Sequence, residues 1–243
     1  MTGRTTAFTP EQFASIYPAG VEHHYWNLCR NRVIDRMLRG IGAIGPMIEV
    51  GCGKGLVVQA LRAKGHDLVG VDIAQVEAVP SASAWVRTGT DALALPEAEA
   101  KRYRTLLLLD VIEHIDEPEG FIAQLRSAFP SVEWIVATVP ARQELFSEHD
   151  TFNRHFRRYD LRTLRMHMDP TAAPGWKASY FFHALYPIAW LQARWSKKRR
   201  KFSAPGGFAS TIHAALGYTL YLEHLVLPGR LRGTSIIGAA RIR

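Results

Sequence analysis

The sequence of 243 residues contains few cysteines and no apolar run at its start. Its two cysteines, Cys29 and Cys52, are too few for a disulfide framework, so the sequence is not that of a small disulfide-stabilised secreted protein. The first ten residues are polar and do not resemble a signal peptide. These absences predict a protein of a reducing compartment, that is, a cytoplasmic protein.

Long apolar stretches are also missing. The longest stretch without Asp, Glu, Lys or Arg is 202–222, and it begins with the turn-forming run Ser203–Gly207. The remainder, 208–222, falls short of the ~20 apolar residues that a membrane-spanning helix needs. We therefore expect no transmembrane span, although peripheral contact with the inner face of a membrane is compatible with the sequence.

Acidic residues are scarce in the last third of the chain. Residues 161–243 contain 13 Lys and Arg but only 2 Asp and Glu, a balance of +11. Residues 1–160 contain 17 basic and 20 acidic residues, a balance of −3. The basic excess is therefore confined to one part of the chain, which indicates a basic surface with a particular partner.

From about residue 46, short apolar runs rich in Leu and β-branched residues alternate with helical stretches. This pattern predicts a doubly wound α/β fold with a mostly parallel, seven-stranded sheet. We expect a single domain over 1–243, with an N-terminal helical cap at 1–45 and a basic, aromatic helical insertion at 183–230. The expected strands are 47–50, 68–72, 84–87, 105–110, 132–139, 176–182 and 234–242.

A glycine-rich segment, Glu49-Val50-Gly51-Cys52-Gly53-Lys54-Gly55, lies where the first strand is expected to turn into a helix. Glycine allows a tight turn and a close approach to a ligand. A dinucleotide-binding fingerprint would have its third glycine at position 56, which is Leu56 here. An acid at Glu49 is more typical of a site for a cationic ligand than of one for pyrophosphate.

Three motifs together carry a resemblance to a known family. The glycine loop, Asp72 at the end of the second strand and the run Asp110-Val111-Ile112-Glu113-His114-Ile115 resemble the motifs of class I S-adenosylmethionine-dependent methyltransferases. The resemblance covers about residues 20–165. It implies a Rossmann-like sheet and S-adenosylmethionine as the methyl donor.

The same resemblance implies a cofactor site. Glycines of the loop line the methionyl part, and Glu49 lies near its ammonium group. Asp72 accepts hydrogen bonds from both ribose hydroxyls, whereas Asp91 faces the adenine amino group. Asp110 lies close to the methionine end. Alternatively, Asp72 and Asp91 are carboxylates at a strand end or in a turn and bind no ligand. The implied cofactor-binding residues are Glu49, Gly51, Gly53, Gly55, Asp72, Asp91 and Asp110.

Two polar segments are candidates for the acceptor side. Methyl transfer requires the acceptor atom to be held against the methyl group and, for oxygen, a proton to be removed. The first segment is 110–114, where two carboxylates and an imidazole share one face if a helical turn begins there. The second is 147–160, in which His149 and His155 are candidate general bases. Its arginines could hold an anionic acceptor, or be merely a charged face. The candidate catalytic residues are Glu113, His114, His149 and His155.

A divalent metal is a further expectation from resemblance. The sequence resembles ubiquinone-biosynthesis O-methyltransferases and small-RNA 2′-O-methyltransferases, in which a Glu-x-x-Glu-His run binds a metal. Asp110, Glu113 and His114 match that run, with Asp in place of the first Glu, and His155 or His149 is the candidate fourth ligand. Such an ion would lower the pKa of an acceptor hydroxyl. Many class I methyltransferases have a similar run without metal, so a metal-free site remains the alternative.

The insertion at 183–230 admits several interpretations. Its aromatic residues and the basic run Lys197–Lys201 suit an interfacial membrane contact. The same aromatics could form a lid over a hydrophobic acceptor, and the charge could bind RNA or an acidic carrier protein. Extra core helices joined by a basic loop would have the same composition. RNA ranks below a membrane or lipid-like acceptor because no aromatic nucleic-acid motif accompanies the charge.

These patterns predict a methyltransferase that uses S-adenosylmethionine to methylate the oxygen of a small hydrophobic or membrane-derived acceptor, such as a quinone-like phenol. Two alternatives remain open. One is an RNA 2′-O-methyltransferase. The other is a non-catalytic cofactor-binding module that docks through its basic insertion.

Overall fold

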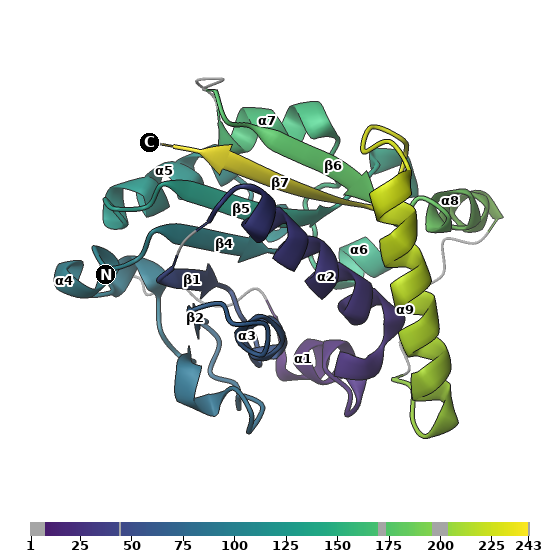
Figure 1. The fold of residues 1–243 in the computed structure, drawn as a ribbon, viewed down its shortest axis with the longest axis horizontal. Coiled ribbons are helices and arrows are strands. Elements are labelled where there is room, and N and C mark those ends of the chain that lie inside the picture. The colour runs from purple at the N-terminus through teal and green to yellow at the C-terminus, as the bar shows by residue number, and fades with distance from the viewer. Residues whose placement is uncertain (1–7, 44, 170–173, 196–203, 243) are drawn as a thin grey trace.

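The computed structural model describes residues 8–43, 45–169, 174–195 and 204–242. It contains one seven-stranded sheet (Figure 1). Its strands are β1 (Met47–Val50), β2 (Leu68–Val71), β3 (Val86–Arg87), β4 (Thr105–Leu109), β5 (Trp134–Pro140), β6 (Lys177–Phe181) and β7 (Ser235–Arg241). Their order is β3-β2-β1-β4-β5-β7-β6, with β7 antiparallel to both of its neighbours and the other pairs parallel. The predicted doubly wound, mostly parallel sheet is thereby confirmed.

Helices cover both faces of the sheet (Figure 1). They are α1 (Pro10–Ile16), α2 (Tyr25–Gly40), α3 (Leu56–Arg62), α4 (Glu97–Ala100), α5 (Pro118–Ala128), α6 (Glu148–Phe152), α7 (Leu161–Met168), α8 (Leu185–Trp195) and α9 (Phe208–Val226). All predicted strand ends agree with the structure within two residues. Strand β3 begins two residues later than predicted because residues 83–85 form a 3-10 turn. The predicted basic run Lys197–Lys201 lies outside the described residues.

Strand β4 shows how the sheet separates two cores. All five of its residues are buried. Leu106 and Leu108 belong to the core that includes α5 and α7. Leu107 and Leu109 belong to the opposite core, with α2, α3 and Leu220 of α9. Because successive side chains of a strand point to opposite faces, a continuous leucine run is what a sheet covered on both sides requires.

The N-terminal helices and the helices before β7 pack together. Helix α1 begins with a capping box, in which Thr9 and Gln12 exchange hydrogen bonds between side chain and backbone. Helix α9 lies against α2, and the two come close at Gly217, where an added Cβ would be 2.9 Å from the Tyr25 carbonyl oxygen. Glycine therefore permits this approach.

Glu223 fastens α9 to the start of α8. The backbone N–H groups of His183 and Ala184, just before α8, donate to the two Glu223 carboxylate oxygens at 2.5 and 3.0 Å. A carboxylate at a helix N-terminus satisfies donors that the helix itself leaves unpaired. Within the described residues, the structure shows no helix that combines the length and apolarity needed to cross a membrane.

The close approach of α9 to α2 can be tested with two glycine-to-alanine substitutions. Gly217→Ala should lower the free energy of unfolding by about 1–3 kcal/mol relative to Gly40→Ala, since overpacking costs about this much. Gly40, at the end of α2, has open space where its Cβ would be, so its substitution should be neutral or stabilising. Urea denaturation of both variants measures the difference, and equal stabilities would contradict the packing described.

Candidate active site

A large cavity lies along the carboxyl ends of β1, β2 and β4. Its volume is about 1590 Å³, and its walls include residues of α1, α2 and α8. Val50, Val71 and Leu109 mark the ends of the three strands on this wall. Ligands of open α/β sheets bind at this edge, outside the carboxyl ends of the strands. The fold thus brings the predicted glycine loop and acceptor segments to one site.

The glycine loop after β1 requires its three glycines. Gly51, Gly53 and Gly55 have φ angles of 80°, 54° and 81°, in the left-handed region that other residues rarely adopt. A Cβ at Gly51 would lie 2.7 Å from a methyl group of Val111, and one at Gly53 would overlap the Tyr17 hydroxyl. The loop therefore lies tightly between α1 and the β4 end, and Gly51 and Gly53 line the cavity.

Asp72 lies after β2, where the sequence predicts the ribose-binding acid. Its two carboxylate oxygens accept the Gly53 N–H at 2.6 Å and the Ala74 N–H at 2.7 Å. Burial raises the pKa of Asp72, and the two backbone hydrogen bonds oppose this rise. Each carboxylate oxygen can accept a second hydrogen bond. Asp72 is thus oriented on the cavity wall with acceptor capacity left for a ligand.

Asp91 lies on the same wall as Asp72. One of its carboxylate oxygens accepts the Leu93 N–H at 2.9 Å and caps the 3-10 turn 92–94. This capping bond is a structural role that needs no ligand. The Asp91 carboxylate can accept further hydrogen bonds. That one of them comes from an adenine amino group stays a prediction.

Sequence reasoning missed Arg30 of α2, which is buried and lines the cavity. Its Nε lies 3.1 Å from a carboxylate oxygen of Asp110, and its guanidinium lies over the Trp26 ring at 4.6 Å. The available signal was an arginine among apolar residues, next to Cys29 and near Val33 on the buried face of α2. A charge on an apolar helix face needs a partner.

Glu49 is buried at the end of β1. Burial raises its pKa to about 8, with Arg30 opposing the rise and the nearby charges of Asp72 and Asp110 adding to it. One Glu49 carboxylate oxygen has no hydrogen-bond partner among the described residues. An unpaired buried carboxylate is costly unless a ligand or proton neutralises it. Glu49 is not among the residues that line the cavity, and its contact with an ammonium group stays a prediction.

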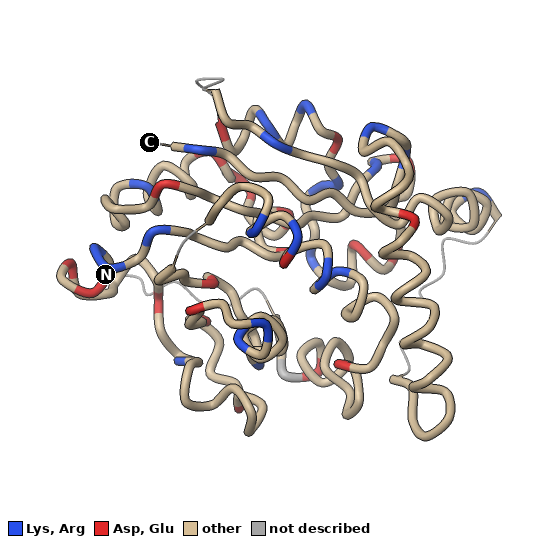
Figure 2. The backbone as a smooth tube through the Cα atoms, in the orientation of Figure 1, with Lys and Arg blue, Asp and Glu red and all other residues tan. Residues whose placement is uncertain are grey.

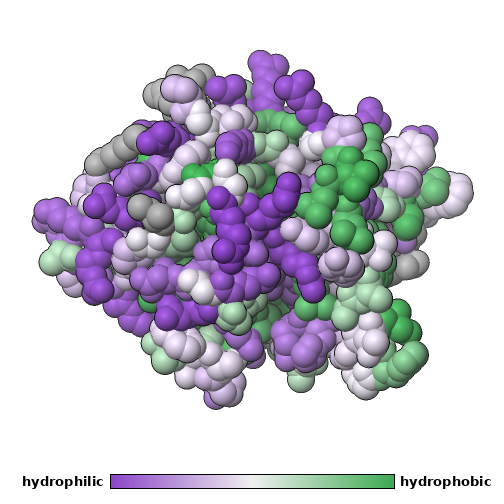
Figure 3. Space-filling view, in the orientation of Figure 1, coloured by the Kyte–Doolittle hydropathy of each residue, from purple (hydrophilic) through white to green (hydrophobic). Residues whose placement is uncertain are grey.

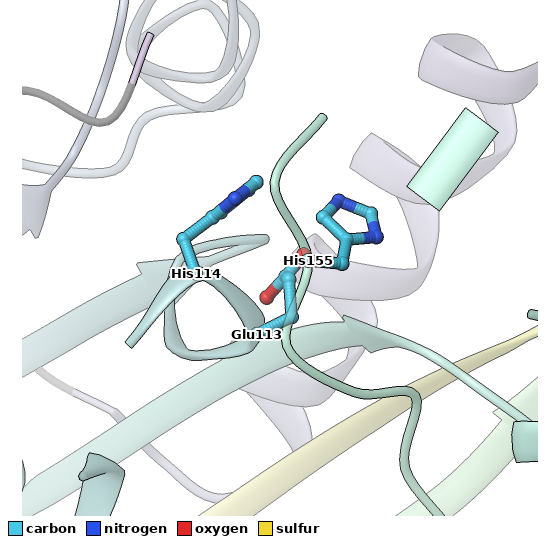
Figure 4. Close-up of side chains that lie close together, drawn as sticks. All are labelled: Glu113, His114 and His155. Carbon is cyan, nitrogen blue, oxygen red and sulfur yellow. The ribbon is translucent and has the colours of Figure 1, made fainter. Parts of the chain in front are cut away.

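On the acceptor side, Glu113, His114 and His155 converge (Figure 4). Their candidate ligand atoms all lie within 4.8 Å of one another. Glu113 and His114 belong to the 3-10 turn Ile112–His114 after β4, whereas His155 follows α6. His114 and His155, which are 41 residues apart in the sequence, meet here. The cluster therefore joins the two polar segments that the sequence predicts for the acceptor.

A buried carboxylate orients His155. Its Nδ1 lies 2.8 Å from an Asp150 oxygen, and the Arg158 Nε–H donates to the same oxygen at 2.8 Å. Burial alone would raise the pKa of Asp150, but the hydrogen bond from His155 and the charge of Arg158 hold it well below its usual range. Asp150 is therefore ionised and fixes the ring so that the other nitrogen of His155 is available.

His114 is held neutral. Burial, together with the nearby His155, lowers its pKa to about 4, while hydrogen bonds to the backbone of 153–154 act in the opposite direction. The two imidazole rings lie edge to face, with centroids 4.7 Å apart. Among the described residues, His114 Nδ1 has no hydrogen-bond partner, and neither has one oxygen of Glu113. Neutral imidazoles and a carboxylate are suitable metal ligands.

Asp110 and His149 lie apart from this cluster. Asp110 has a φ of 57°, and its carboxylate pairs with Arg30. His149 hydrogen-bonds the Asn153 side chain at 3.0 Å. Both line the cavity, but the described cluster holds Glu113, His114 and His155 without them. The helical turn on which we expected Asp110 to share a face with Glu113 is absent, because the chain forms a 3-10 turn that begins at Ile112.

A protein-family model described as a methyltransferase domain matches residues 22–171. This match covers more than half of the chain and includes both the glycine loop and the acceptor cluster. The chain belongs to this methyltransferase family.

Individual relatives of this methyltransferase are distant. The ubiquinone biosynthesis O-methyltransferase of Hahella chejuensis is 25% identical over 108 residues, which are 41% of this chain and 45% of that protein. The match thus spans less than half of that relative's length.

Solved structures share the fold. A methyltransferase of Thermotoga maritima, described as a possible histamine N-methyltransferase, has a TM-score of 0.53 and 13% identity, over 96% of this chain and 99% of that one. Phosphoethanolamine N-methyltransferase 2 of Haemonchus contortus, in complex with S-adenosyl-L-methionine, has a TM-score of 0.51 and 14% identity. The match covers 97% of this chain and 60% of that one. Identities this low support the fold alone.

The predicted role of Asp72 can be tested against Asp91. Asp72→Asn should weaken S-adenosylmethionine binding by about tenfold or more, because charge-assisted hydrogen bonds contribute roughly 1.5–3 kcal/mol each. Asp91→Asn should have the smaller effect, since the resemblance assigns one amino group to Asp91 and two ribose hydroxyls to Asp72. Isothermal titration of both variants checks this, and unchanged affinity of Asp72→Asn would remove the ribose assignment.

The burial of Glu49 predicts a pH-dependent stability. Its pKa is raised from 4.5 to about 8, so the ligand-free folded state holds a proton that the unfolded chain loses. Stability from this group is present below pH 4.5 and is lost as the pH rises toward 8. Glu49→Gln should therefore raise the melting temperature more at pH 8 than at pH 5, which corresponds to a difference in the free energy of unfolding on the order of a few kcal/mol. An equal effect of the substitution on the melting temperature at both pH values would contradict a raised pKa of Glu49.

Proposed function

We propose that this methyltransferase transfers a methyl group from S-adenosylmethionine to a hydroxyl oxygen of a small hydrophobic or lipid-like acceptor such as a quinone-like phenol. The observation that carries the proposal is the cluster of Glu113, His114 and His155 on the wall of the large cavity. It offers a carboxylate and two imidazoles where a neutral oxygen has to be activated.

The methyl-donor end of the cavity suits a cation. S-adenosylmethionine carries a sulfonium and an ammonium group. Asp110 lines the cavity, and the buried Glu49 lies in the neighbouring strand β1. Asp72 has acceptor capacity for hydroxyl groups on the same wall. This combination of acids supports a positively charged, hydroxyl-bearing ligand better than an anionic dinucleotide.

The residues of the acceptor cluster fit a divalent metal. Glu113 and His114 each have a buried polar atom without a partner in the described structure, as vacant ligands would. His155 is backed by Asp150, the carboxylate–histidine pairing that is typical around metal ligands. Mixed imidazole and carboxylate ligands suit Zn, Mn or Fe at least as well as Mg. Such an ion would supply Lewis acidity that lowers the pKa of an acceptor hydroxyl.

The acceptor end of the cavity is lined by apolar side chains from several elements. Phe13 of α1, Leu145 and Ile188 of α8 contribute to this wall. Apolar walls with a few convergent polar groups are typical of sites for small organic ligands. The partial similarity to a ubiquinone biosynthesis O-methyltransferase is consistent with an aromatic hydroxyl as the methylated group.

The proposal is tested by methyl transfer from labelled S-adenosylmethionine. The acceptors are a set of catechols and phenols, a lipid extract and RNA, each with added metal and with chelator. Transfer to a phenol or to the lipid extract is expected. Transfer to RNA alone would replace the proposed acceptor by a ribose hydroxyl, and cofactor binding without transfer to any acceptor would leave only a binding module.

The metal assignment predicts different effects of two histidine substitutions. His155→Ala and Glu113→Gln should each reduce binding of Mn²⁺ or Zn²⁺ and the methylation rate by about 10–100-fold, because each removes a ligand or its support. His149→Ala is the matched control, since His149 bonds Asn153 outside the cluster.

Metal binding is measured by calorimetry and by metal analysis of the purified variants. Full activity in chelator, together with loss of activity in His155→Ala, would instead assign His155 as a metal-free general base. Its ring is already oriented for that role by Asp150.

A further inference from the structure

Helix α9 presents an apolar surface to the outside of the molecule. Large apolar side chains are exposed along the whole length of the helix, whose buried residues are Gly217 and Leu220. Phe208 and Val226, at the two ends, are 79% and 80% exposed. Glu223 is the single charged residue of α9, which is therefore almost entirely tan in Figure 2. The exposed large apolar residues of α9 are Phe208, Ile212, Leu216, Tyr218, Leu222, Leu225 and Val226.

Helix α8 extends this apolar surface. Trp190, Leu191 and Trp195 are exposed on α8, Trp195 to 83%. Green atoms gather over the α8 and α9 side of the molecule in Figure 3. The hydrogen bonds of Glu223 join the C-terminal part of α9 to the two residues just before α8. Soluble proteins rarely expose so many large apolar side chains together without a partner.

Basic residues lie beside this surface. The acid Glu144, which accepts a hydrogen bond from the Tyr186 hydroxyl of α8, is paired with Arg142. Arg194 of α8 and Arg230, which follows α9, are exposed. Of the two acids in 161–243, Asp169 is buried and Glu223 is bonded to the α8 start. A second copy of the chain would bring like charges together, whereas an anionic surface would be attracted.

The surface is also continuous with the cavity. Ile188, Ala189 and Gln192 of α8 line the acceptor side of the cavity, and Leu191 and Trp195 of the same helix are exposed. We propose that the apolar surface of α8 and α9 docks on an anionic lipid bilayer, with α8 at the boundary between bilayer and cavity. That the acceptor enters along α8 rests on the proposed function; the docking itself does not.

Vesicle flotation of the full chain tests the docking. Wild type should float with vesicles of phosphatidylcholine and phosphatidylglycerol and much less with phosphatidylcholine alone, because basic residues near an anionic surface add affinity. The double variant Phe208→Ser/Val226→Ser should partition roughly tenfold or more weakly, since it removes two exposed apolar side chains. Met166→Ser is the matched control, because Met166 is 49% exposed on α7, away from this surface.

A second measurement uses the emission of an attached dye in place of the loss of binding. Cys29 and Cys52 are buried, so a polarity-sensitive dye can be attached selectively to Val226→Cys or Met166→Cys. Anionic vesicles should shift the emission of the dye to the blue at position 226 and leave it unchanged at position 166.

Several outcomes would overturn the docking. These are equal flotation of wild type and double variant, no flotation of wild type, or equal dye responses. A wild-type dimer that dissociates in the double variant would assign the surface to a second copy. Methyl transfer to a water-soluble phenol should be unchanged in the double variant, so failure of the docking and failure of the proposed function are distinguishable.

Discussion

Buried acids around one arginine form the interaction on which the site depends. Glu49 lies in β1 and Glu113 in the 3-10 turn after β4, and burial disfavours the ionised form of both. Arg30 opposes that effect at both carboxyl groups and pairs with Asp110 at 3.1 Å. One guanidinium cannot offset the charge of several buried acids, so the ligand-free site holds a proton on Glu49 at neutral pH. A cationic methyl donor would complete this balance, whereas pyrophosphate would meet repulsion.

Because Arg30 offsets the charge of the buried acids, the helices outside the sheet have a role in the site. Arg30 comes from α2, and α2 is held against the sheet on one side and packs against α9 on the other, at Gly217. Helix α9 in turn fixes α8 through Glu223, and α8 lines the acceptor part of the cavity. The N-terminal helices and the helices before β7 are therefore walls of the active site as well as additions to the sheet. Their outward surface can face a partner while their inner side faces the ligands.

Local patterns in the sequence were sufficient for the fold and for the glycine loop. Continuous apolar strands, left-handed glycines and an acid after β2 follow from backbone constraints that act over a few residues. Arg30 could not be predicted in the same way, because its partner Asp110 is far away in the sequence. Asp110 itself was grouped with Glu113 on the assumption of a helical turn, but its φ of 57° directs the chain differently. The support of His155 by Asp150 likewise depends on a turn whose geometry local spacing does not specify.

The charge balance is tested most directly by the protons exchanged when S-adenosylmethionine binds. Glu49, with its pKa raised to about 8, holds a proton in the free protein at pH 7. A bound cation should lower that pKa, so binding should release a proton. Calorimetric titration at pH 7 in buffers of different ionisation enthalpy should show a release approaching about one proton per ligand, and Glu49→Gln should abolish it. Binding without proton release, or identical proton exchange in Glu49→Gln, would contradict the account.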